Sequence, residues 1–273
     1  MNKSIPEFIT PEKIQVMIDA MVDSFRASRK QIVEQAGMVA FVHKDDGSPV
    51  TTIDTEVEKS VTLAMTSRFP DIPVFGEESG YSEFLPDVCW LVDPIDGTKS
   101  YIKNIPTYTS MAVLIISNVA RASVIYNPTT DEIFTALAGN GAYKNGVRLD
   151  LKNSALPKEV FCKIQDRVTL QELLTEFDIQ AHVAASGAGY GMLQVADSKA
   201  AARFHLHSGR HIHDHAPGAL LIREAGGDVI PIFEDDYTVQ TRSFVACHPG
   251  LSDLVRNNID LLRNLEDPEQ ALS

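Results

Sequence analysis

Two carboxylates follow an apolar run in the first half of the chain. The run Val88–Val92 predicts a buried strand, and Asp93 and Asp96 come directly after it, separated by Pro94 and Ile95. Two acids at the end of a buried strand are unfavourable unless something pairs with them. No basic residue stands between them. A hard divalent cation, which prefers oxygen ligands, is therefore the expected partner.

The residues after the second acid indicate an anion beside that cation. Gly97 allows the backbone to approach a ligand closely. Thr98 suits the start of a helix, where free backbone amides attract anions. Metal-binding acids next to such a helix start predict phosphate chemistry. The alternative is that Asp93 and Asp96 are ordinary turn residues, and the buried strand on one side with Thr98 on the other disfavours it.

Two more acidic segments flank this one in the sequence. Upstream, the apolar segment Val74–Gly76 ends in Glu77 and Glu78. Downstream, Asp214 opens an apolar, helix-like segment that stops at a Gly-Gly pair. Three groups of acids therefore occur at the ends of predicted strands and helices.

These segments resemble the three-part signature of the inositol monophosphatase family. The chain reads G-E-E-S at 76–79, D-P-I-D-G-T at 93–98, and D-x-A-x-G at 214–218 with E-A-G-G at 224–227. Three motifs in this order are highly specific. The resemblance, which runs from about residue 44 to 227, implies a layered α/β (α+β) fold, a five-layer αβαβα sandwich of the sugar-phosphatase type. It also implies a magnesium-dependent, lithium-sensitive phosphomonoesterase.

The resemblance further implies a ligand set for two or three Mg²⁺ ions per site. Glu77, Asp93 and the carbonyl of Ile95 resemble the first metal site, and Asp93, Asp96 and Asp214 resemble the second. Glu77 with waters resembles a weaker third site. Asp214 could instead only cap the helix that it opens, but its place in D-x-A-x-G favours a metal ligand.

The resemblance also implies roles in the reaction. Thr98 and Glu77 orient the attacking water, and Asp54 hydrogen-bonds to Thr98. The backbone amides of Gly97 and Thr98 hold the phosphate. Asp54 ends a segment that resembles the P-V-T-x-x-D pattern of the family. The alternative for Asp54 is helix capping, since Asp is a favoured N-cap residue.

The substrate end is less well defined by the sequence. The segment that holds Ser186, Gly187 and Ala188 is expected to line it. His207 stands seven residues before Asp214, where family members that use inositol phosphate usually carry an acid. An acid there would contact sugar hydroxyls, so His207 puts inositol in doubt.

Other positions resemble different branches of the family. Lys99 and Ser100 resemble branches that act on histidinol phosphate, and the lysine also occurs in branches that act on 3'-phosphoadenosine nucleotides. Tyr126-Asn127-Pro128 resembles the general inositol branch. The leading expectation is an enzyme like an inositol-1-phosphatase, with these two activities as alternatives. A non-catalytic regulator that binds metal and phosphate is an alternative of another class, which the intact motifs disfavour.

Five histidines lie close together around Asp214. A transition-metal site is one interpretation, because imidazole is a common zinc ligand. No recognised zinc spacing is present, so substrate contact or water-exposed packing is favoured. One member, His213, stands where the family usually has Trp. The five are His205, His207, His211, His213 and His215.

Composition narrows the partners and the compartment. The chain has 273 residues, with 24 basic and 37 acidic side chains and a net charge of -13. That charge disfavours binding to a nucleic-acid polymer and leaves a small phosphate monoester as the expected partner.

Three widely spaced cysteines without a C-x-x-C pair indicate free thiols in a reducing compartment. No apolar run is long enough to span a membrane, so the protein is expected to be cytoplasmic. The family resemblance, rather than the composition, implies a homodimer.

The pattern predicts one family-like domain over residues 1–273. Residues 1–150 would carry the metal and phosphate site, and residues 151–273 the last metal ligand and the substrate end. Hydrophobic spacing predicts the elements that position the acids. Expected helices begin at Pro11 and Asp54 and cover 170–177, 216–224 and 251–265; a hairpin covers 41–52; expected strands cover 74–76, 88–92, 110–116, 122–126, 132–137, 181–185, 201–205, 228–232 and 243–247.

Overall fold

The structure is a computed structural model. It describes most of the chain, and Ser186 and His207 lie outside the described residues. The described residues are 9–45, 47–80, 85–162, 167–175, 177–183, 187–206 and 211–266.

A seven-stranded sheet carries the acidic motifs of the first half. Its strands follow the order β3-β4-β5-β6-β7-β8-β9, with β3 and β4 parallel and the later pairs antiparallel. The central strands are rich in β-branched residues and buried on both faces, as expected of a sheet covered on both sides. The bounds are β3 Val74–Gly76, β4 Val88–Asp96, β5 Thr109–Ile116, β6 Val119–Asn127, β7 Glu132–Leu137, β8 Gly141–Lys144 and β9 Val147–Arg148.

Two long helices precede this sheet. α1 spans Pro11–Gln35 and starts as predicted, with the Thr10 hydroxyl accepting the Lys13 amide at 3.2 Å. α2 spans Thr52–Arg68. The prediction that Asp54 opens α2 is wrong, because Thr51 is the N-cap and Asp54 completes a capping box three residues later. The predicted hairpin is confirmed by β1 Phe41–His43 and β2 Pro49–Thr51.

A five-stranded sheet follows in the second half, in the order β11-β10-β12-β14-β13. It mixes two parallel pairs with two antiparallel pairs. Four of its strands match predicted segments to within a residue or two, and β10 was not predicted. The bounds are β10 Glu159–Cys162, β11 Gln180–Val183, β12 Ala202–His205, β13 Asp228–Pro231 and β14 Phe244–Cys247.

The remaining helices differ from prediction in several places: α4 begins three residues before its predicted start and α6 begins four residues before its own. α5 was not predicted, and its sequence contains two glycines, which disfavour helices in isolation. The predicted helix over 251–265 is broken at Asn258 into α7 and α8. The bounds are α3 Thr98–Ile102, α4 Arg167–Thr175, α5 Ala188–Ala196, α6 Ile212–Glu224, α7 Ser252–Asn257 and α8 Ile259–Glu266.

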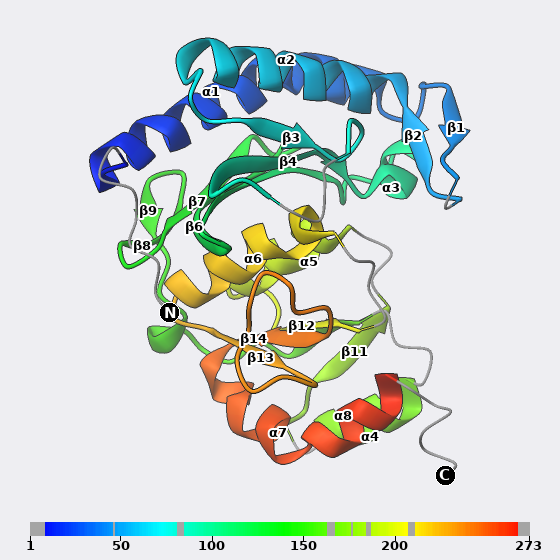
Figure 1. Cartoon of the computed structure of the whole chain (residues 1–273). Helices are drawn as coiled ribbons and strands as arrows, with labels where there is room; N and C mark the ends of the chain where they lie inside the picture. The colour runs from blue at the N-terminus through cyan, green and yellow to red at the C-terminus, as the bar shows by residue number, and fades with distance from the viewer. Residues whose placement is uncertain are drawn as a thin grey trace.

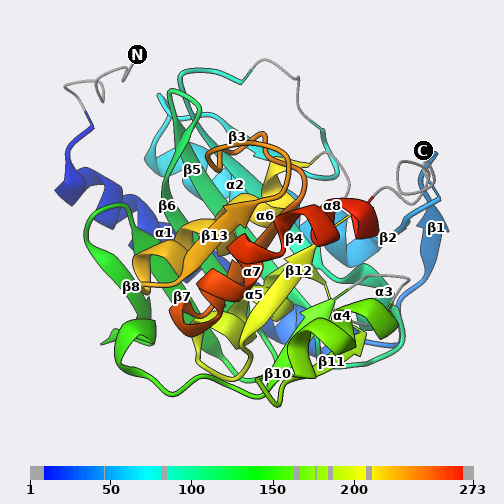
Figure 2. The ribbon, with the colours of Figure 1, turned by 90° about the horizontal axis from the view of Figure 1, so that it is seen from below.

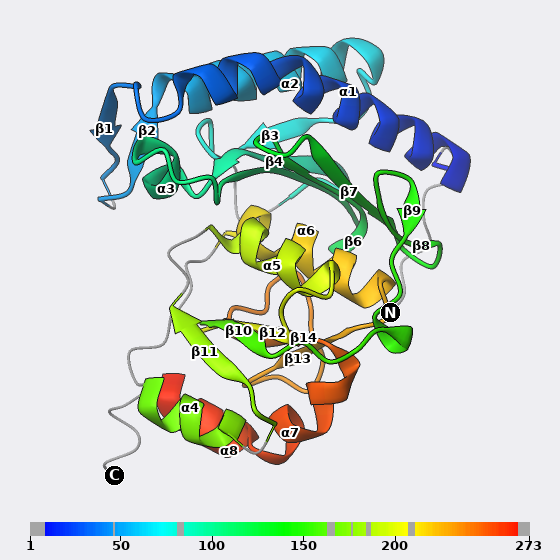
Figure 3. The ribbon, with the colours of Figure 1, turned by 180° about the vertical axis from the view of Figure 1, so that it is seen from behind.

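The elements stack in five layers, which confirms the predicted αβαβα sandwich (Figure 1). α1 and α2 cover the outer face of the first sheet, and α5 and α6 lie between the two sheets (Figures 1 and 3). α4, α7 and α8 cover the outer face of the second sheet and lie nearest the viewer in the view from below (Figure 2). The site therefore lies where the end of β4 meets the central helices.

Candidate metal and phosphate site

β4 carries two of the predicted acids further into the sheet than expected. The strand does not stop at Val92 but continues to Asp96, and all nine of its residues are buried. Asp93 is paired with Met111 and Asp96 with Thr109, so β4 holds one extra residue between the two acids. An extra residue of this kind re-aims side chains at a sheet edge. As a result both acids can face the central layer.

Glu77, Asp93 and His213 form the core of the site. One possible ligand atom from each lies within 4.8 Å of the others. Asp93 is 1% exposed, and its Oδ1 has no hydrogen-bond partner among the described residues. Burial, followed by the charges of Glu77, Asp96 and Asp214, raises the pKa of Asp93 well above its usual value. A buried carboxylate oxygen with no donor is a fitting ligand for a hard cation.

Lys44 holds the other side of Glu77. Its Nζ lies 2.8 Å from Glu77 Oε1, and it also contacts both carboxylate oxygens of Glu78, at 3.0 Å and 2.9 Å. Burial alone would raise the pKa of Glu77, but His213 and Lys44 hold it below its usual value. Burial and the neighbouring Glu77 raise the pKa of Glu78 to about 7. Glu78 thus pairs with Lys44, and it is not one of the predicted metal ligands.

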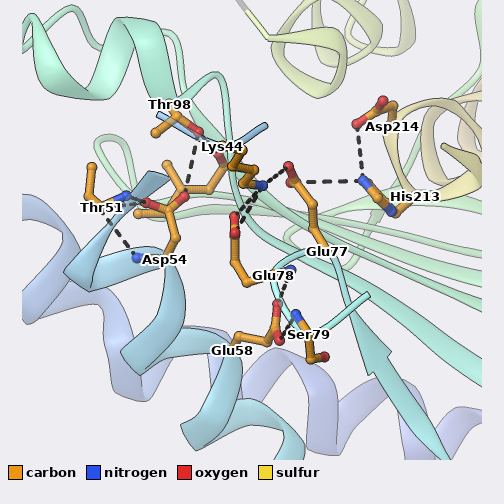
Figure 4. A network of polar contacts seen from close by, with 11 residues as sticks. Lys44, Thr51, Asp54, Glu58, Glu77, Glu78, Ser79, Thr98, His213 and Asp214 are labelled. Atoms are coloured by element: carbon orange, nitrogen blue, oxygen red, sulfur yellow. Dashed lines mark hydrogen bonds and ion pairs between the residues drawn. The ribbon is translucent and has the colours of Figure 1, made fainter. Parts of the chain in front are cut away.

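Glu58 on α2 fixes the turn after β3. Its carboxylate accepts the backbone amides of Glu78 at 2.7 Å and of Ser79 at 2.9 Å (Figure 4). A Cβ atom on Gly76 would meet the Glu58 carboxyl carbon at 1.9 Å, so only glycine fits there. The position of Glu77 therefore depends on a buried acid in the preceding helix.

Thr98 and Asp54 lie together, as predicted (Figure 4). The Thr98 hydroxyl is 3.5 Å from Asp54 Oδ1 and 3.1 Å from the carbonyl oxygen of Ile95. Asp54 Oδ2 accepts the Thr51 amide at 2.9 Å and the Thr51 hydroxyl. Burial raises the pKa of Asp54 to about 6, although the Thr51 hydrogen bonds act in the opposite direction. Asp54 thus contacts Thr98 and takes part in the capping box of α2, although Thr51 and not Asp54 is the N-cap.

Asp96 contacts α5. Its Oδ1 accepts the Ala188 amide at 2.9 Å, and its Oδ2 accepts the Gly189 amide at 2.8 Å and the Thr109 hydroxyl at 3.1 Å. Gly187 packs so closely that a Cβ there would meet Asp96 Oδ2 at 2.2 Å. The predicted site residues Gly187 and Ala188 therefore lie against a predicted metal ligand.

Gly97 joins the two halves at the same point. Its φ of 88° lies in the left-handed region that favours glycine. A Cβ atom would lie 3.1 Å from the Gly187 nitrogen and 3.2 Å from the Thr107 carbonyl oxygen. Gly97 is the N-cap of α3, whose first residue is Thr98. The expected helix start after the two acids is confirmed.

Asp214 lies in the first turn of α6, beside the core group. Its Oδ1 is 3.4 Å from Nε2 of His213, which in turn lies 3.8 Å from Glu77 Oε2 (Figure 4). Burial lowers the pKa of His213 to about 4, so the imidazole is neutral at pH 7. The expectation of water-exposed packing is wrong for His205, His213 and His215, which are buried.

Three contributors to the site, Lys44, Glu58 and Thr51, were not singled out from the sequence, and the closeness of His213 to Glu77 was not predicted. Lys44 lies in a hairpin 33 residues before Glu77, and His213 follows Glu77 by far more, so only the fold brings them together. Glu58 could have been found, because it lies one turn after Asp54 on the same helix face. Thr51 also had a signal, since T-x-x-D resembles a capping box.

The layers and the acids at the end of β4 are those of a metal-dependent phosphatase of the sugar-phosphatase fold type. The sequence model of the inositol monophosphatase family matches residues 10–261. The chain belongs to that family and is a phosphatase that hydrolyses phosphate monoesters.

Individual relatives match over most of the chain. An inositol monophosphatase of Dictyostelium discoideum is 27% identical over 82% of this chain and 84% of its own length. The Nus factor SuhB of Escherichia coli is 30% identical over 73% of this chain and 78% of its own. The solved structure of a Thermotoga maritima IMPase covers 90% of this chain and 98% of its own, with 21% identity and a TM-score of 0.77. An IMPase/NADP phosphatase complexed with Mg²⁺ and phosphate covers 90% and 94%, with 16% identity and a TM-score of 0.75.

Proposed function

We propose that the chain hydrolyses a small phosphorylated metabolite, in the manner of an inositol-1-phosphatase, with two or three Mg²⁺ ions bound. The observation that carries this proposal is the placement of Asp93. Its buried oxygen lacks a partner among the described residues and lies in one group with Glu77. Thr98 and Asp54 lie beside that group.

The ligand set is the one predicted from the sequence. Glu77, Asp93 and the carbonyl of Ile95 would hold one ion; Asp93, Asp96 and Asp214 would hold the second. When bound, Mg²⁺ neutralises phosphate charge and lowers the pKa of a water. A carboxylate has about four lone-pair sites. The hydrogen bonds of Asp96 with α5 and Thr109 occupy only part of these sites, so Asp96 can keep them while it binds an ion.

The chain's own groups orient the reaction. The Thr98 hydroxyl can donate to Asp54 or to the Ile95 carbonyl, and its lone pairs can then accept a hydrogen bond from the attacking water. Glu77 contributes a second acceptor for the same water. The amides of Gly97 and Thr98 would hold the phosphate. Each group acts best in the fixed position that the capping box and the Glu58 contacts give it.

Several finer properties belong to the same proposal. We infer inhibition by lithium, a homodimer and a single domain of two halves, all from the family resemblance. A cytoplasmic location is supported by three buried free cysteines at positions 89, 162 and 247. No helix among the described residues is long and apolar enough to cross a membrane.

Two other substrates, and a non-catalytic regulator in place of an enzyme, are the alternatives to be tested. Histidinol phosphate and 3'-phosphoadenosine nucleotides are the alternatives that Lys99 and Ser100 suggest. The Escherichia coli relative that is named a Nus factor supports the regulator alternative. A net charge of -13 argues against a nucleic-acid polymer as the partner of this chain.

A substrate panel decides among these activities. Purified protein with Mg²⁺ is assayed for phosphate release from inositol 1-phosphate, histidinol phosphate, 3'-phosphoadenosine 5'-phosphate and sugar phosphates. We expect the highest kcat/KM for inositol 1-phosphate. A higher value for either alternative reassigns the substrate, and binding of metal and phosphate without turnover on the whole panel supports the regulator.

A further inference from the structure

One nitrogen ligand lies among the oxygen ligands of the site. His213 comes from α6, is 2% exposed, and places a ring nitrogen within 4.8 Å of carboxylate oxygens of both Glu77 and Asp93. Asp93 gives independent evidence that an ion binds here. It is only 1% exposed, and its Oδ1 has no hydrogen-bond partner among the described residues.

We propose that His213 is a further ligand of the first metal, beside Glu77, Asp93 and the Ile95 carbonyl, so that this site combines nitrogen and oxygen ligands and suits a divalent metal such as Co²⁺ or Zn²⁺. The inference rests on the proposed function, since it concerns the same site. It adds a metal class that an all-oxygen set would not favour: carboxylates and carbonyls suit Mg²⁺, whereas imidazole suits later divalent metals.

The spacing of the atoms fits shared coordination. His213 Nε2 lies 3.8 Å from Glu77 Oε2 and 3.4 Å from Asp214 Oδ1. Well-formed hydrogen bonds of this kind are about 2.7–3.2 Å long. Two ligand atoms on one tetrahedral Zn²⁺, each about 2.0–2.1 Å from the ion, are roughly 3.4 Å apart. The 3.8 Å between the nitrogen and its proposed co-ligand Glu77 Oε2 is within about 0.5 Å of that separation.

The surroundings hold the imidazole and the carboxylate in place. The His211 ring stacks on His213 with centroids 5.1 Å apart and planes inclined by 14°. On the far side, Lys44 binds Oε1 of Glu77, which leaves Oε2 facing His213 (Figure 4). Each of the two carboxylate oxygens thus has a different neighbour. A metal between Glu77 Oε2 and Nε2 would not displace the lysine.

Metal binding by wild-type protein and two variants tests the assignment. His213→Gln replaces the nitrogen by an amide, and His182→Gln, at an exposed position of the edge strand β11, is the control. Isothermal titration gives the Kd of Co²⁺ and of Mg²⁺ for each protein without any substrate. We expect His213→Gln to weaken Co²⁺ by at least about tenfold and Mg²⁺ much less. His182→Gln should leave both Kd values near wild type.

Spectroscopy gives the direct test. Mn²⁺-loaded protein labelled with ¹⁵N-histidine should show the hyperfine coupling of a bound imidazole nitrogen, and His213→Gln should lose it. Where the Gln variant does not fold by circular dichroism, His213→Trp, which restores the usual family residue, takes its place. No nitrogen coupling in wild type, or equal weakening of Co²⁺ and Mg²⁺ by the variant, overturns the proposal. Mg²⁺-supported phosphate release tests the enzyme function separately, so either can fail alone.

Discussion

The carboxylate of Asp96 accepts the backbone amide of Ala188 at 2.9 Å, joining two residues that are 92 positions apart. This contact places the first turn of α5 against the acidic end of β4. Gly189 and Thr109 donate to the other oxygen of Asp96. One predicted metal ligand therefore also connects the first sheet to the central helical layer.

Asp96→Asn should destabilise the metal-free protein. An Asn amide nitrogen cannot accept from Ala188 or Gly189, so one buried donor loses its partner. We expect a loss of about 1–3 kcal/mol in the free energy of unfolding. Urea unfolding in the presence of a chelator measures it. An unchanged or higher stability would show that the acid repulsion at this position outweighs its three hydrogen bonds.

Asp93→Asn should have the opposite effect on the metal-free protein. Burial and nearby acids raise the folded-state pKa of Asp93 above its unfolded value. The folded state therefore binds the extra proton, and wild-type stability falls as pH rises above about 4. The asparagine of the variant does not ionise, so the variant does not lose stability in this way as the pH rises. We expect the variant to be more stable than wild type at pH 8, with a smaller difference at pH 5, as measured by urea unfolding. A variant less stable at pH 8 contradicts this.

Local patterns predicted much of the fold and most acids of the site. The strands β3 and β7 have the predicted bounds, since alternation and turn residues define them locally. α5 was missed because its helix depends on tertiary packing: a Cβ at Gly189 would meet the Met111 sulfur at 2.3 Å. The contacts of Glu77 with Lys44 and His213 were missed because they join distant segments, and hydrophobic periodicity contains no information on such pairs.

Thr98→Ala should lower kcat far more than it weakens Mg²⁺ binding. Thr98 is assigned to the reacting water through its contacts with Asp54 and Ile95, not to a metal. Losing a positioned hydrogen bond of this kind costs about a hundredfold or more in rate. Steady-state kinetics over a range of Mg²⁺ concentrations separates the effects. If saturating Mg²⁺ restores the wild-type kcat, Thr98 supports a metal instead.

Glu58→Ala should loosen the turn that presents Glu77. The substitution leaves the part-buried amides of Glu78 and Ser79 without their charged acceptor, which costs about 1–3 kcal/mol in unfolding free energy. We also expect a weaker Kd for Mg²⁺, measured by isothermal titration. The control is Glu56→Ala on the exposed face of the same helix, which should change stability by less than about 0.5 kcal/mol. An unchanged Mg²⁺ Kd in a folded Glu58→Ala protein would refute the positioning role.

The central claim is that this acidic site hydrolyses phosphate monoesters with Mg²⁺. The most direct measurement is phosphate release from inositol 1-phosphate by purified protein, with Mg²⁺, with a chelator and with Mg²⁺ restored. The account predicts turnover that the chelator abolishes and Mg²⁺ restores. It also predicts that Asp93→Asn, purified in the same way, is nearly inactive, which excludes a contaminating phosphatase. Turnover that survives chelation, or activity near wild type in Asp93→Asn under saturating Mg²⁺, would contradict it.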